Sequence, residues 1–170
     1  MPDETDITDF RQMIEGLRQI KDSATDIVAD ATGDPGADQG QIGKVAENAS
    51  KLREQLRILE NLKGWIETKN LEAQRLLDEV QHEADVQRRG ALQAEAEEVL
   101  AKVREATERL NRIPELSCET VTEVQNWAGT MRELAQDRER TVENINTIVN
   151  IVSGAVEIAA KFLPLAALAI

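Results

Sequence analysis

An apolar residue recurs at every seventh position through the middle of the chain, and this recurrence constrains the fold more than any other feature. The recurring residues are Val45, Leu52, Leu59, Ile66, Ala73 and Val80, then Leu92, Val99, Ala106 and Ile113, with Ala96, Val103 and Leu110 between the members of the second series. A seven-residue apolar repeat is typical of helices that pack lengthwise in a coiled coil. We therefore predict a helical stretch from Gln41 to about Asn111, with its two registers offset between Val80 and Leu92. Gly64 and Gly90 lie inside it and weaken it locally.

Segments rich in glycine and proline divide the chain. Before the first of them, apolar residues at steps of three and four predict an amphipathic helix within residues 1–31, with Asp6 as its N-cap. Residues 32–40 hold glycines and a proline, and we interpret them as a flexible linker. The proline-containing segment at 112–117 predicts a second turn. Residues 41–146 are therefore expected to form a long helical hairpin that reverses near 112–117.

Composition supports a helical fold and argues against a nucleic-acid ligand. The chain has 32 acidic and 20 basic residues, a formal charge of −12, and its aromatic residues are two Phe and two Trp with no Tyr. Sheet proteins depend on aromatic residues more than this, and a strongly negative chain repels a phosphate backbone. We expect an all-α protein: an elongated helical bundle or coiled-coil hairpin with an apolar C-terminal helix.

The single Cys118 cannot form an internal disulfide, which fits a reducing compartment. The first ten residues, MPDETDITDF, lack the basic and apolar regions of a Sec signal peptide. We expect a cytoplasmic protein that associates with a membrane only on activation.

The last segment, residues 147–170, contrasts with the rest because it holds only Glu157 and Lys161 as charged residues. On a helix its polar residues fall in a sector of roughly 80°. This polar stripe consists of Asn146, Asn150, Ser153, Glu157 and Lys161. Glu157 and Lys161 have the spacing of a stabilising ion pair.

The apolar surface of this segment covers roughly 240° of the helix, which is far more than the apolar face of a typical surface helix. Its interface residues are predicted to be Ile148, Val149, Ile151, Val152, Val156, Ile158, Phe162, Leu163, Leu165 and Leu168. We expect that two neighbouring helices cannot cover this arc, so a second copy, a protein partner or lipid must do so. The charges and Pro164 disfavour a simple membrane-spanning anchor, but a ring of such helices around a water-filled centre fits the pattern.

Candidate catalytic groups are few. Glu79 and His82 have the spacing of a di-iron ligand pair, but the chain has no second histidine. Asp34 and Asp38 do not have the spacing of an EF-hand. We expect no enzymatic activity, no cofactor, no metal and no small-molecule substrate.

The residues Trp127-Ala128-Gly129 resemble the Trp-x-Gly signature of the small helical proteins that are exported by type VII secretion. In that family the motif lies in a turn between two helices, whereas periodicity here predicts that it is mid-helical. We expect Gly129 to allow a close helix–helix approach, with Trp127 in the groove beside it, and Trp65 to be a further packing residue.

Two functions fit this pattern. In the first, a soluble bundle oligomerises and acts on membranes through its C-terminal segment, an organisation that resembles the α-helical pore-forming toxins and cell-death effectors. The alternative is a coiled-coil scaffold or adaptor whose C-terminal segment is the interface of a homo-oligomer or of a protein partner.

Overall fold

The computed structural model describes residues 6–169, and in this part of the chain it contains helices and no strand. The all-α prediction is confirmed. The elements are α1 (Thr8–Ala31), α2 (Gln39–His82), α3 (Val86–Asn111), α4 (Cys118–Ala135), α5 (Arg138–Glu143), α6 (Ile145–Ala160) and the 3₁₀ helix η1 (Leu163–Ala169). The predicted ends of the first and last segments, at residues 1–5 and 170, lie outside the described residues.

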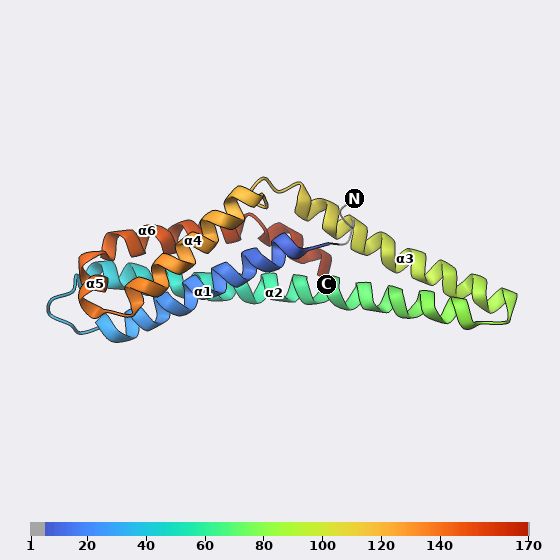
Figure 1. Ribbon diagram of the computed structural model, residues 1–170, viewed down its shortest axis with the longest axis horizontal. Helices are drawn as coiled ribbons and strands as arrows, with labels where there is room; N and C mark the ends of the chain where they lie inside the picture. The colour runs from blue at the N-terminus through green and yellow to red at the C-terminus, as the bar shows by residue number, and fades with distance from the viewer. Residues whose placement is uncertain (1–5, 170) are drawn as a thin grey trace.

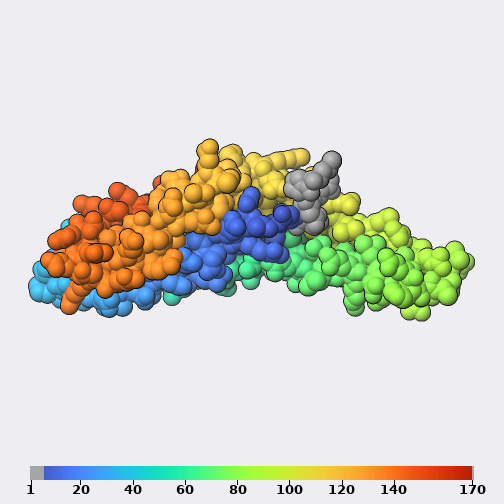
Figure 2. Space-filling model, in the orientation of Figure 1, coloured from blue at the N-terminus to red at the C-terminus, as the bar shows by residue number. Residues whose placement is uncertain are grey.

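The molecule is elongated, with a helical bundle at one end and a two-helix arm at the other (Figures 1 and 2). In the bundle α1 packs against both α2 and α4, and α6 packs mainly against α2. The apolar side chains of α1 are wholly buried there; they are Phe10, Met13, Ile14, Leu17 and Ile20. The arm consists of α3 and the second half of α2, and it has a small core of its own, formed by Ala73, Leu76, Ala96 and Val99.

The seven-residue repeat marks the buried seam of both long helices. Val45, Leu52, Leu59, Ile66 and Ala73 are buried along α2, and Ala96, Val99, Val103, Ala106 and Leu110 are buried along α3. Neither Gly64 nor Gly90 interrupts its helix. The repeat therefore identifies the packed faces correctly along both helices of the arm.

The predicted reversal of the hairpin near 112–117 is wrong, because the chain reverses at residues 83–85 and pairs α2 with α3. The side chain of Asp85 caps α3 by accepting a hydrogen bond from the backbone N–H of Gln87 at 3.0 Å. This pairing buries the two apolar registers against each other. After residues 112–117 the chain does not return along α3 but enters α4, which packs on α1.

The stretch that follows is also interrupted, although its sequence predicts an unbroken helix into the last segment. The helix α4 ends at Ala135, and Asp137 caps the short α5 by accepting from the N–H of Glu139 at 2.9 Å. The buried hydroxyl of Thr141 donates to the carbonyl of Leu134 at 2.7 Å. These bonds stabilise a corner, so α6 begins in a new direction.

Residues 32–38 form a hydrogen-bonded turn between α1 and α2. Gly33 has φ +82°, a left-handed conformation that glycine adopts without strain. The carboxylate of Asp34 pairs with Arg138 at 2.8 Å, and that of Asp38 caps α2 by accepting from the N–H groups of Gly40 and Gln41. Asp34 therefore joins the turn to α5, and Asp38 joins it to the start of α2.

Candidate functional site

The C-terminal segment, defined here as α6 and η1 (residues 145–169), is the candidate site. The helix α6 lies against α2 and also contacts α1 and α4 (Figure 1). The helix η1 then lies against α2 and α3, near the point where the arm leaves the bundle. The segment therefore contacts both parts of the molecule.

The ten apolar residues predicted as an interface all face the chain's own helices. Ile148, Ile151, Val152, Phe162 and Leu165 are buried, and Val149, Val156, Ile158, Leu163 and Leu168 are half-buried. The expectation that the cover must come from outside the chain is wrong. The reason is that α1, α2 and α4 pack around α6 from more than one side, and η1 folds back onto α2 and α3.

The predicted polar stripe faces the solvent. Asn146, Asn150, Glu157 and Lys161 are exposed, and Ser153 is half-buried. Within residues 6–169 no ion pair joins Glu157 to Lys161, although their spacing permits one. The two charges are therefore free to meet other groups.

A close contact between α4 and α6 depends on a glycine, but not on the predicted one. A methyl group added to Gly154 would lie 2.9 Å from the indole carbon Cη2 of Trp127, closer than carbon atoms pack. A methyl group on Gly129 would meet no atom within 4 Å. The prediction for Gly129 is wrong: Trp127 is mid-helical in α4, and its ring packs on Gly154 instead.

Two glutamines of α2 bind α6 by hydrogen bonds. The side-chain amide of Gln41 donates to Oδ1 of Asn146 at 2.7 Å, and that of Gln55 donates to the carbonyl of Val156 at 3.2 Å. Their own Oε1 atoms are buried and accept no hydrogen bond. Neither glutamine is identified by the sequence analysis. Their spacing of two heptads, which puts both on one face of α2, is the sequence feature that could have indicated a shared role.

Aromatic rings lie beside the C-terminal part of the segment. The ring centroids of Phe10 and Phe162 lie 5.7 Å apart, within the range of a favourable aromatic pair. The half-buried Trp65 of α2 lines a groove together with Leu168 of η1. Both tryptophans of the chain, Trp65 and Trp127, therefore lie beside the C-terminal segment and can report on its position by fluorescence.

The candidate catalytic residues of the sequence are not brought together. His82 is exposed at the end of α2, and its Nδ1 lies 2.9 Å from the carbonyl oxygen of Asp78. Cys118 is exposed at the start of α4, after the whole length of α3, roughly 40 Å at 1.5 Å per residue. In the described part of the chain, no group of three His, Cys, Asp or Glu side chains is placed to hold a metal ion.

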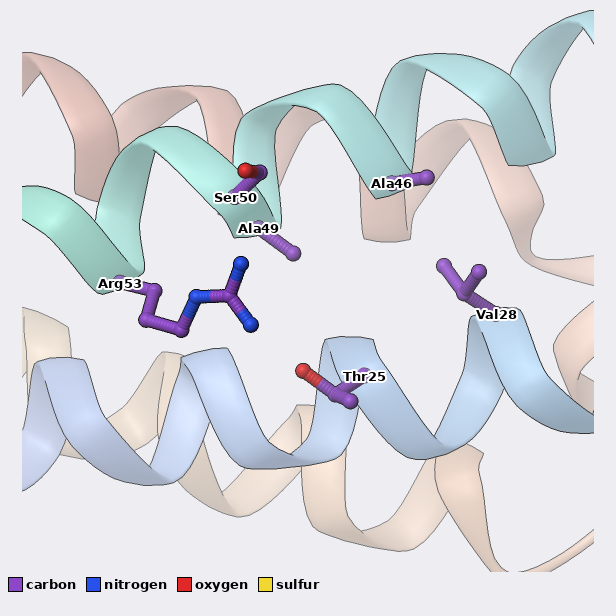
Figure 3. Close-up of a pocket in the computed structure, with 6 residues that line it drawn as sticks. All are labelled: Thr25, Val28, Ala46, Ala49, Ser50 and Arg53. Carbon is purple, nitrogen blue, oxygen red and sulfur yellow. The ribbon is translucent and has the colours of Figure 1, made fainter.

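A shallow groove of about 150 Å³ lies between α1 and α2, and Figure 3 shows the guanidinium of Arg53 extending into it. Its other lining residues are Thr25, Val28, Ala46, Ala49 and Ser50. The lining offers one cation and two hydroxyl groups, with no base beside either hydroxyl. This groove is not arranged as an active site.

Among residues 6–169 no single helix is long and apolar enough to cross a membrane, but α6 and η1 together are, with a bend of 44° at their junction. Comparison of the chain with protein-family models, with curated proteins and with solved structures finds no match.

Proposed function

We propose that this chain is a non-enzymatic helical-bundle protein that stores its C-terminal segment against the bundle and acts on membranes when the segment is released. One observation carries the proposal: the segment has the length and apolar composition of a bent membrane span, yet its large apolar side chains pack against the chain's own helices. Such an arrangement keeps an apolar segment out of water until lipid replaces its protein contacts.

The energetics of burial favour the stored position in water. Each large apolar side chain contributes about 1.5–3 kcal/mol when it is buried, so the six buried ones of the segment together contribute on the order of 10 kcal/mol. Release into water would lose most of this free energy. Release into a bilayer would keep it, because the hydrocarbon layer is as apolar as the protein core.

The remaining helices contact one another directly, so they can stay packed when α6 leaves. The helix α1 packs directly on α2 and on α4, and α2 packs directly on α3. The helix breaks at Asp137 and Asn144, on either side of α5, are where the proposal places the rotation that frees α6. In a homo-oligomer of released segments, the polar stripe would face a shared water-filled centre.

Dye release from vesicles tests this function. Asn146 and Gln41 lie in hydrogen-bond contact, so Gln41→Cys and Asn146→Cys in a Cys118→Ser chain can be joined by a cleavable bis-maleimide that holds α6 on α2. We expect the unlinked chain to release dye from vesicles of neutral lipid, which do not repel a chain of charge −12, the linked chain to release none, and cleavage of the linker to restore release. The two single-cysteine chains, treated alike, are the controls.

Equal dye release before and after cleavage of the linker would contradict the proposal. So would an intact chain that neither binds vesicles nor releases dye.

The arm favours a second candidate function, that of an interaction scaffold. It projects beyond the bundle and carries the two large apolar side chains that are exposed in the described residues, Leu71 at 66% and Val86 at 74% (Figure 1). If copies of the chain associate through the arm, Leu71→Glu with Val86→Glu will lower the mass measured by light scattering to that of a monomer. A wild-type chain that is already monomeric would exclude self-association through the arm.

A further inference from the structure

A groove of about 610 Å³ lies where the arm leaves the bundle, and three elements form its walls. Its lining residues are Trp65 and Lys69 from α2, Lys102 and Glu105 from α3, and Ala167 and Leu168 from η1. This volume is within the range of grooves that hold small organic ligands.

The lining divides into an apolar part and a cationic part. Trp65, Ala167 and Leu168 offer apolar surface, whereas Lys69 and Lys102 offer two ammonium groups from opposite helices. A ligand that fits both parts has an apolar body and an acidic head.

The acidic groups beside this groove leave its cationic character in place. Glu105 pairs with Arg109 at 3.0 Å, which directs its carboxylate to a partner that does not line the groove. Lys69 pairs with Glu72 at 3.2 Å, and Lys102 pairs with Glu98 at the long distance of 3.9 Å. The Lys102–Glu98 pair is exposed and long, so it is weak and exchanges readily with another anion. The Lys69–Glu72 pair is half-buried, so an acidic head must compete there with the Glu72 carboxylate.

We infer that this groove binds a small anionic amphiphile, of the class of single-chain carboxylates, with its chain on Trp65 and Leu168 and its head between Lys69 and Lys102. The inference goes beyond the function proposed above and does not rest on it, because the groove exists in the stored state. Since η1 forms one wall, a bound amphiphile would also hold the end of the C-terminal segment to the arm, and it would stabilise the stored state by mass action.

Titration calorimetry with dodecanoate below its critical micelle concentration tests the inference on the full chain. We expect saturable binding of one molecule per chain, and a change in tryptophan emission that saturates at the same concentration. Dodecyltrimethylammonium and dodecyl maltoside, which have the same chain with a cationic and a neutral head, are expected to bind at least tenfold more weakly.

Charge variants locate the site. Lys69→Gln with Lys102→Gln is expected to weaken dodecanoate binding by about three- to tenfold, the amount expected when two exposed ion pairs are lost. Lys44→Gln with Lys51→Gln removes the same charge from exposed positions of α2 outside the groove and is expected to leave binding unchanged. Leu168→Asp is expected to abolish binding, with the helical circular dichroism signal retained.

Three results would overturn the inference: no saturable binding of dodecanoate, equal binding of the cationic amphiphile, or unchanged binding in the Lys69 and Lys102 double variant. Each of these is distinct from a failure of the membrane proposal, because no vesicle is present in the assay.

Discussion

The packing of Trp127 on Gly154 shows how one missing side chain positions a helix. The indole edge occupies the space that a Cβ atom at Gly154 would need, so α4 and α6 lie closer there than two larger residues would permit. Gly129, two residues from Trp127, faces open space. Two glycines with the same effect on helix propensity therefore have opposite roles in packing.

Alanine at these two glycines is expected to shift stability in opposite directions. Gly129→Ala should stabilise the fold by up to about 1 kcal/mol, because alanine favours the helix and meets no atom. Gly154→Ala should destabilise it by about 1–3 kcal/mol, because the indole must move. Urea unfolding of each variant measures both. Adding Trp127→Phe to Gly154→Ala should recover part of the lost stability. If the stability changes of the two substitutions simply add, Trp127 is not the cause of the loss.

Asp6 stabilises the start of α1 as an ionised group. The hydroxyl of Thr8 donates to its carboxylate at 2.5 Å and the backbone N–H of Thr8 donates at 2.9 Å. Both bonds lower the pKa of Asp6 below its ordinary value of 3.8, and the bond from the hydroxyl has the larger effect. The prediction that Asp6 is the N-cap is wrong, because Ile7 occupies that position and Asp6 binds Thr8 from one residue before it.

The lowered pKa predicts a definite pH dependence for Asp6→Asn. A carboxyl group whose pKa is lower in the folded state contributes stability above its unfolded pKa and loses it as the pH falls through the folded value. The wild type should therefore exceed the variant in stability by a constant amount from pH 7 to 5. The difference should shrink below about pH 3.8 and then disappear. Thermal melts across this range measure it, and a difference that grows at low pH would contradict the assignment.

At the scale of the elements, the arm depends on a short turn and a small core. Four buried side chains, Ala73, Leu76, Ala96 and Val99, hold its two helices together beyond the main core. The turn at 83–85 is fixed by the cap that Asp85 provides. A unit with so few buried contacts opens more easily than the bundle.

Asp85→Ala is therefore expected to loosen the arm selectively. Loss of the cap should cost about 1 kcal/mol, and this cost should fall on the arm. Hydrogen exchange should show faster exchange at residues 71–99 and unchanged protection in α1 and α4. Asp137→Ala, which removes the equivalent cap of α5, is the matched control and should leave the arm unchanged. Faster exchange throughout the molecule would show that arm and bundle unfold together.

Sequence periodicity predicts the helices and their buried faces, but it does not predict how the helices connect. The turn at 83–85 contains neither glycine nor proline, and its signal is Asp85 alone, one aspartate within an acidic run. For this reason the sequence favours the later, proline-containing segment as the reversal. The unpredicted break before α6 has a similar origin: its signals are Asp137, a single capping residue, and Thr141, whose bond to Leu134 forms only in the folded corner.

At the scale of the whole molecule, the cover of the C-terminal segment depends on topology. The apolar arc of residues 147–170 is so wide that the sequence predicts incomplete cover by two neighbouring helices. This prediction treats the segment as one straight helix. It fails because the segment bends: α6 lies among α1, α2 and α4, while η1 turns onto α2 and α3. Each half meets different neighbours, so a short chain covers a surface that a straight helix would leave exposed.

In the function proposed above, the stored position would let one sequence serve two environments. The apolar face is complementary to the bundle core through contacts such as Phe10 with Phe162, and the polar stripe faces water. The same two faces suit an assembly of segments in lipid, with the stripe inward. The account therefore requires that the segment separates from α2 when a membrane is present.

The distance between α2 and α6 measures this separation directly. Lys51 of α2 and Asn150 of α6 are both exposed, so spin labels on Lys51→Cys and Asn150→Cys in a Cys118→Ser chain disturb little packing. Pulsed electron paramagnetic resonance is expected to give one short, narrow distance in buffer. With vesicles of neutral lipid, that distance should give way to a longer, broader distribution. A short distance that persists in vesicle-bound protein would contradict the account, since the segment would then remain part of the bundle core.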